Sequence, residues 1–83
     1  MGKVEVLRVE RVENVPHPIT VELRLENFGL TFRRERGTKK VSYSKTYFGS
    51  VLPEKDIYVP PALFHKMKRR AYAILFEKRK SRE

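Results

Sequence analysis

Strict alternation of apolar and polar side chains is the clearest pattern along the chain. Residues 19–25 alternate without an exception, beginning at Ile19 and ending at Leu25. A period of two places successive side chains on opposite faces of a strand, so this segment predicts a half-buried strand. Residues 41–48 predict another strand, in which one row is Val41, Tyr43, Lys45 and Tyr47 and the other is Ser42, Ser44, Thr46 and Phe48.

Two further strands follow from less regular patterns. Residues 3–13 are rich in valine, and their apolar phase changes between Val6 and Leu7, as a β-bulge or a bend requires. The apolar phase shifts again at Phe28, so a tight turn or a bulge is expected at residues 27–29, before a third strand or a bent continuation. Consecutive strands joined by short turns predict an antiparallel sheet.

Turn and helix signals complete the second half of the chain. Gly37 supplies the glycine that a hairpin turn needs, residues 49–56 have the composition of a loop, and residues 57–59 predict a short strand. Pro60 and Pro61 mark the start of a helix, because proline is tolerated in the first turn. Beyond them, one helical face is formed by Phe64, Met67, Ala71, Ile74 and Leu75. The predicted fold class is α+β, a small antiparallel β-sheet of four to five strands followed by one C-terminal amphipathic α-helix.

The net charge narrows the functional classes. The chain of 83 residues is expected to form a single basic domain with a short basic tail at residues 78–83. Its 19 Lys and Arg against 10 Asp and Glu give a formal net charge of +9, an excess typical of proteins with a polyanionic partner, most commonly nucleic acid. Residues 1–30 carry a net charge of −1, whereas residues 31–50 and 51–83 carry +5 each. A binding surface is therefore expected beyond residue 30.

Several protein classes are disfavoured by what the sequence lacks. Without cysteine there is no disulfide, no thiolate metal site and no cysteine nucleophile. Charges recur from Lys3 onward, so we expect no secretion signal, no transmembrane segment and a cytoplasmic location. A composition rich in Glu, Lys and Arg and without Gln is common in proteins from hot environments, which suggests a thermophile as the source.

Catalytic and metal-binding chemistry is not indicated either. His17 and His65 lack the spacing of a metal site, and the four glycines stand alone, so no phosphate-binding loop is present. Glu54 and Asp56 form a close carboxylate pair, which a polar loop explains. We expect no enzyme activity, no metal and no cofactor.

Three groups of residues are candidates for a nucleic-acid interface. The first is a basic hairpin with the side chains Arg33, Arg34, Arg36, Lys39 and Lys40. Because side chains alternate across a strand, Arg34 and Arg36 are expected on one face and Arg33 on the other, with the two lysines at the tip. Such a hairpin can enter a groove or straddle a backbone. The alternative is an edge strand whose charges prevent pairing with another chain.

The second group lies on the predicted strand at residues 41–48. Tyr43 and Tyr47 flank Lys45 on one face, which would provide two stacking platforms beside a phosphate contact. A stacked base contributes roughly 1–3 kcal/mol to single-strand binding. Aromatic residues are also favoured in any half-buried strand. If Val41 points into the core, both tyrosines point there too, and the two interpretations stay open.

The third group is the polar face of the predicted helix together with the last turn and the tail. Its cations are Lys66, Lys68, Arg69, Arg70, Lys78, Arg79, Lys80 and Arg82. They would contact phosphates rather than read bases, so affinity would fall as salt rises. Cations near a helix C-terminus also suit its dipole. A basic amphipathic helix can instead lie on an anionic membrane, although the sheet would then have little to pack against.

The order of the predicted elements, strands followed by one C-terminal helix, resembles that of the positive cofactor four family of single-stranded-DNA-binding transcription coactivators. This resemblance is one of topology and basic character and assigns no residue of this chain. The size, charge and basic tail are similar to those of small ribosomal proteins, which bind ribosomal RNA through hairpin tips and extensions.

We expect a non-enzymatic RNA-binding protein, associated with the ribosome or another structured RNA in a ribonucleoprotein assembly. One alternative is a single-stranded-DNA-binding protein that forms a homodimer. The other is a module whose basic face docks on an acidic protein or a membrane.

Overall fold

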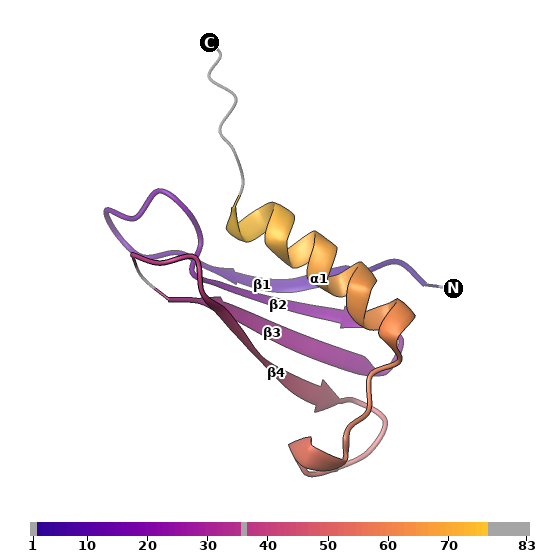
Figure 1. Ribbon diagram of the computed structural model, residues 1–83. Helices are drawn as coiled ribbons and strands as arrows, with labels where there is room; N and C mark the ends of the chain where they lie inside the picture. Colours follow the sequence, from indigo (N-terminus) through magenta and orange to yellow (C-terminus); the bar gives the residue numbers. More distant parts are fainter. Residues whose placement is uncertain (1, 36, 77–83) are drawn as a thin grey trace.

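The computed structural model describes residues 2–35 and 37–76. It has a four-stranded antiparallel sheet followed by one helix (Figure 1). The elements are β1 (Glu5–Glu10), β2 (Thr20–Leu25), β3 (Phe28–Arg34), β4 (Val41–Tyr47), the 3-10 helix η1 (Glu54–Asp56) and α1 (Pro61–Leu75). This arrangement confirms the predicted α+β class. No helix within the described ranges combines the length and the apolar composition needed to cross a bilayer.

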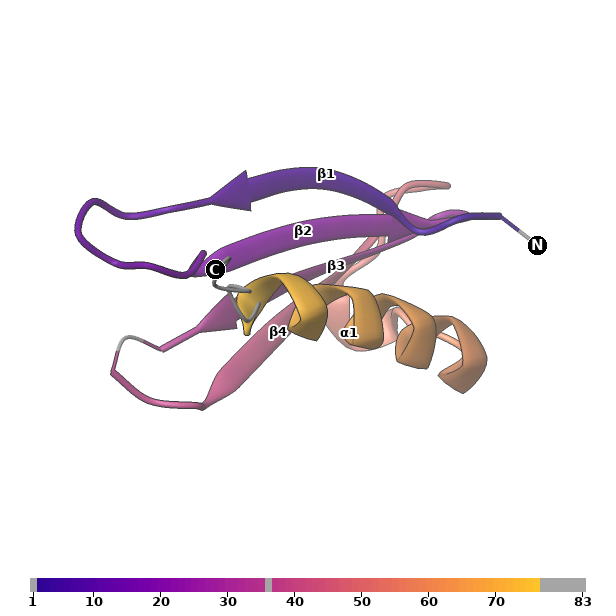
Figure 2. The ribbon, with the colours of Figure 1, turned by 90° about the horizontal axis from the view of Figure 1, so that it is seen from above.

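The strands lie beside one another in the order in which they occur in the chain. The order β1-β2-β3-β4 makes an antiparallel meander (Figure 2). The predicted bulge in the first strand is confirmed, because the pairing with β2 skips Leu7 between Val6 and Arg8. The bulge explains the change of apolar phase, since one extra residue turns every later side chain of the strand to the other face.

The β2–β3 turn differs from its prediction. Leu25 pairs directly with Phe28, so the turn consists of Glu26 and Asn27 rather than residues 27–29. Glu26 makes this tight reversal with a φ of 59°, in the left-handed region, which costs a residue with a Cβ atom about 1–2 kcal/mol. The apolar pattern marks where the phase changes but not which residue adopts the unusual backbone conformation.

One face of the sheet carries the hydrophobic core. Five side chains of β2 and β3 are at most 1% exposed, namely Val21, Leu23, Leu25, Leu30 and Phe32. α1 lies over these two strands and buries a row of its own, Leu63, Met67, Ala71 and Leu75. Burial of each large apolar side chain contributes about 1.5–3 kcal/mol. The predicted helix face is thus shifted, because Leu63 belongs to it, whereas Phe64 and Ile74 are only partly buried beside it.

Residues 57–59 do not form the predicted short strand. Ile57 and Val59 are buried and Tyr58 is 72% exposed, so the alternation in the sequence reflects true alternation of burial. The segment nevertheless pairs with none of the four described strands. It runs from η1 to Pro61, where α1 starts as predicted. Packing against the core, without a ladder of hydrogen bonds, is enough to produce this pattern.

Glu26→Gly should make the protein more stable than Glu26→Ala, by about 0.5–1 kcal/mol. Glycine enters the left-handed region without a Cβ penalty, and the alanine variant controls for the loss of the glutamate side chain. Urea unfolding followed by circular dichroism measures both free energies of unfolding. Equal stability of the two variants would contradict a strained turn at this position.

Candidate nucleic-acid interface

α1 carries four exposed cations. Lys68 lies with its Nζ 5.6 Å from the ring centroid of Tyr72, whereas Lys66, Arg69 and Arg70 lie together on the outer face of the helix. Residues three and four positions apart lie on the same side of a helix. The rotation of the helix is set by its buried row, which includes Met67 and Ala71. The predicted basic face of the helix is therefore exposed in the folded protein.

These cations border a groove between α1 and the N-terminal segment. The groove, called the basic groove below, is lined by Gly2, Lys3, Val4, Lys66, Arg69, Arg70 and Ala73. The N-terminal segment is held in place because β1 pairs with β2 from Glu5 onward and Val4 packs against the hydrophobic core. Lys3 thereby adds a fourth cation, from the wall opposite the helix.

Among the residues that the structure describes, the lining of the basic groove contains no acidic side chain. Within residues 2–35 and 37–76, the ion pairs join Arg8 to Glu10 and to Glu22, at 3.4 Å in both cases, and neither involves a cation of the groove. Four positive groups along one concavity concentrate positive potential there. Ammonium and guanidinium groups bind phosphate oxygens through charge-assisted hydrogen bonds. The basic groove therefore suits an anionic ligand with more than one charged group.

The sheet face opposite α1 has a balanced charge. On this face, the pairing of β1 with β2 sets Glu5 beside Arg24 and Arg8 beside Glu22. The row that β4 contributes consists of small hydroxyl side chains, Ser42, Ser44 and Thr46. The excess positive charge of the described surface therefore lies elsewhere than on this face.

The β3–β4 hairpin presents a second group of cations. Lys39 and Lys40 are exposed near its tip, and Arg33 is exposed across from Ser42 on the sheet face opposite α1. Arg34 points to the other face, as alternation predicts, and is half-buried against α1. Five predicted residues of the hairpin and tail lie outside the described part of the chain: Arg36, Lys78, Arg79, Lys80 and Arg82.

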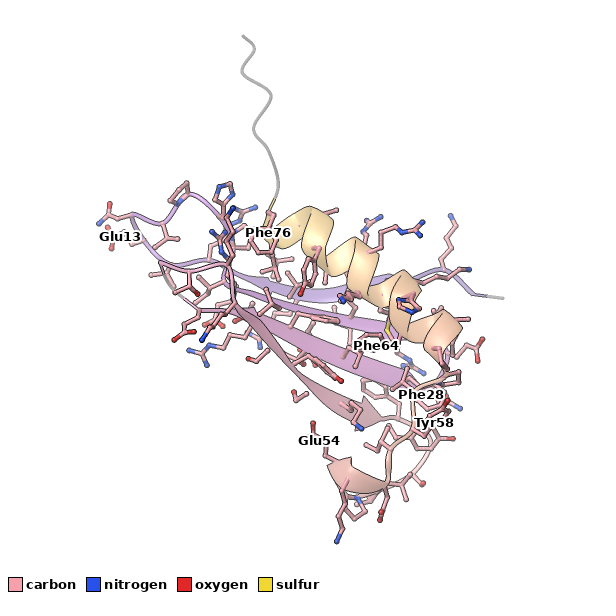
Figure 3. The ribbon with its side chains drawn as sticks, in the orientation of Figure 1. Glu13, Phe28, Glu54, Tyr58, Phe64 and Phe76 are labelled. Carbon is pink, nitrogen blue, oxygen red and sulfur yellow. The ribbon has the colours of Figure 1, made fainter. Side chains whose placement is uncertain are left out.

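The tyrosines of β4 lie on the side of the sheet that faces α1. Tyr47 pairs with Phe28, and their ring centroids are 5.3 Å apart. Tyr43 is 50% exposed, and its ring centroid lies 5.8 Å from that of Phe32 and 5.1 Å from that of Phe64, which projects from α1 toward the sheet (Figure 3). Both rings therefore take part in packing, as in the alternative in which the first residue of the strand points inward.

Lys45 lies between these tyrosines and is half-buried opposite Leu30. Its backbone amide donates a hydrogen bond to Glu54 Oε2 at 3.0 Å, and Glu54 lies beside β4 in Figure 3. A carboxylate thus lies at the edge of the strand that holds Lys45. The surroundings of this cation differ in that respect from the basic groove.

Lys3 is absent from the residues that the sequence predicts for the site. It belongs to residues 1–30, whose net charge of −1 does not indicate a binding surface for nucleic acid. Lys3 lies beside α1 because β1 pairs with β2, and no local sequence pattern predicts that proximity. A cation at the first position of the predicted strand is the one available signal, and many strands share it.

Comparison with protein-family models, with curated proteins and with solved structures gives no match. The described residues also hold no cluster of three or more His, Asp or Glu side chains that could bind a metal ion. The topological resemblance to the positive cofactor four family gains no support from these comparisons. The positions and charges of the side chains are the basis on which function can be inferred.

Tyr47→Ala should lower the free energy of unfolding by about 1–3 kcal/mol, because a half-buried ring and its contact with Phe28 are lost. Tyr58→Ala is the matched control, since it removes the same ring from a position that is 72% exposed, and it should change stability by no more than about 0.5 kcal/mol. Thermal unfolding followed by circular dichroism compares the two. Tyr47→Ala as stable as the control would mean that the Tyr47 ring is free to stack on a base.

Proposed function

We propose that the protein is a non-enzymatic nucleic-acid-binding protein that contacts the backbone of structured RNA. The observation that carries the proposal is the basic groove, where Lys3, Lys66, Arg69 and Arg70 line one concavity that has no acidic side chain in the described part of the chain. Lysine and arginine contacts to phosphates supply affinity and fix the orientation of the protein on the nucleic acid, without reading bases. Binding is therefore strong at low salt and has little sequence preference.

Helical RNA fits this surface better than an extended single strand. Single-strand binding without sequence preference combines a positive channel with aromatic rings on which bases stack. The two tyrosines that would serve as platforms, Tyr43 and Tyr47, are engaged with Phe28, Phe32 and Phe64. A double-stranded RNA is recognised mainly through its shape, its phosphates and its 2′-hydroxyls. Phosphate contacts are the kind that the described cations can make.

The separation of the two groups of cations supports a folded RNA as the partner. The hairpin with Lys39 and Lys40 lies at the end of the sheet away from the N-terminal segment that contributes Lys3 (Figure 1). A folded RNA presents phosphates at several places and in several directions, so separate groups of cations can each find one. This geometry is the reason to favour a ribosomal or other ribonucleoprotein assembly over one extended strand.

Fluorescence anisotropy with a labelled RNA duplex, single-stranded RNA and single-stranded DNA of equal length tests the proposal across a range of salt concentrations. The duplex should bind most tightly, and the logarithm of its association constant should fall linearly with the logarithm of salt, with a slope of about −0.9 per phosphate contact. No binding to any of the three at low salt would refute nucleic-acid binding. Tightest binding to a single strand would favour the stacking alternative.

A matched pair of variants locates the site. Lys66→Gln with Arg69→Gln removes one lysine and one arginine from the basic groove, while Arg11→Gln with Lys55→Gln removes the same two charges from exposed positions elsewhere. The groove variant should bind the duplex roughly tenfold or more weakly, with a salt slope reduced by about 1.5–2. The control should retain nearly the full slope. Equal losses in the two variants would show that net charge alone, and not the groove, drives binding.

A further inference from the structure

Arg34 joins the β3–β4 hairpin to the end of α1. Its Nη1 donates a hydrogen bond to the carbonyl oxygen of Leu75 at 3.1 Å, and its Nε donates to the carbonyl oxygen of Thr38 at 3.2 Å. The guanidinium carbon also lies 4.5 Å from the ring centroid of Phe76. One half-buried side chain therefore contacts two segments that are far apart in the sequence.

The contact with Leu75 satisfies a need of the helix. The last four carbonyl groups of a helix have no partner within it and carry partial negative charge. The last turn of α1 contains no basic residue, and Arg34 brings a cation to this end of the helix from β3. Arg34 thus has a role that the sequence suggests for the basic residues beyond position 77, which lie outside the described part of the chain.

The contact with Thr38 reaches a hairpin tip that is already organised. The Thr38 hydroxyl donates to the carbonyl oxygen of Glu35 and accepts from the amide of Lys40, both at 3.1 Å. The amide of Glu35 in turn donates to the carbonyl oxygen of Lys40 at 2.9 Å. Gly37 provides the positive φ, 74°, at the turn. The tip is thus one hydrogen-bonded unit, and Arg34 ties that unit to the helix.

We propose that Arg34 is a positioning residue of the interface, which holds Lys39 and Lys40 at a fixed place beside the C-terminal end of α1. The proposal rests on the proposed function, because it assigns these two exposed lysines to a second phosphate contact. A planar guanidinium can donate to two carbonyl groups while its face lies on an aromatic ring, whereas an ammonium is a single point donor. Arg34→Lys therefore keeps the charge but loses the connection.

A double-mutant cycle separates positioning from a general loss of stability. Arg34→Lys should weaken binding of the RNA duplex roughly three- to tenfold in the otherwise wild-type protein, and have little effect when Lys39→Gln and Lys40→Gln are already present. Arg11→Lys makes the same exchange at an exposed position outside both groups of cations and serves as the control. Circular dichroism verifies that all variants are folded at the temperature of the titration.

A measurement on the free protein accompanies the cycle. NMR order parameters of the backbone amides at residues 37–40 should fall in Arg34→Lys and stay at the wild-type values in Arg11→Lys. Unchanged order parameters would overturn the proposal, as would an equal loss of binding with and without the tip lysines. If the wild-type protein binds no nucleic acid, the proposed function fails and the interface role of Arg34 fails with it, while the order parameters still show whether Arg34 holds the hairpin tip.

Discussion

A single helix has to cover one face of a four-stranded sheet, and the rest of the structure depends on that constraint. A helix with its side chains is about 10 Å wide, whereas four strands at a spacing of about 4.8 Å span roughly 15 Å between the outer axes. α1 therefore lies over the two central strands, β2 and β3, where the most completely buried side chains are found. A strip of the sheet remains on either side of it, above β1 and above β4.

The two strips differ in the side chains that cover them. Those above β4 contribute to packing, whereas those beside β1 form the candidate binding site. Above β4, the rings of Tyr43 and Phe64 bridge the strand and the helix, and Tyr47 packs against the core, so aromatic residues that look like a binding platform in the sequence contribute to packing. Above β1, the strand is largely exposed, and the basic groove opens between the N-terminal segment and the cations of α1. The same narrow helix thus explains why the aromatic group is engaged in packing and the basic group is not.

Local patterns along the chain predict the elements well and their contacts poorly. A period of two, a phase change and a pair of prolines locate the strands, the bulge and the start of the helix, because each is a property of neighbouring residues. Alternating burial at residues 57–59 looks like a strand but arises from packing alone. Lys3 lies beside α1 because β1 pairs with β2, and Arg34 is held by its hydrogen bond to Leu75, so both positions depend on residues distant in the sequence. In the sequence, neither residue differs from the many other cations that are expected at the surface. The tertiary structure shows what sets each of them apart.

We propose that nucleic acid binds in the basic groove rather than on the strand that carries Tyr43 and Tyr47. Titration of the nitrogen-15-labelled protein with a short RNA duplex, followed by amide chemical shifts, tests it residue by residue. The largest shifts should lie at Lys3 and Val4 and at residues 66–73, with a second group near Lys39 and Lys40. Shifts concentrated on β4 or around Tyr58, with the amides of the groove unchanged, would contradict the account.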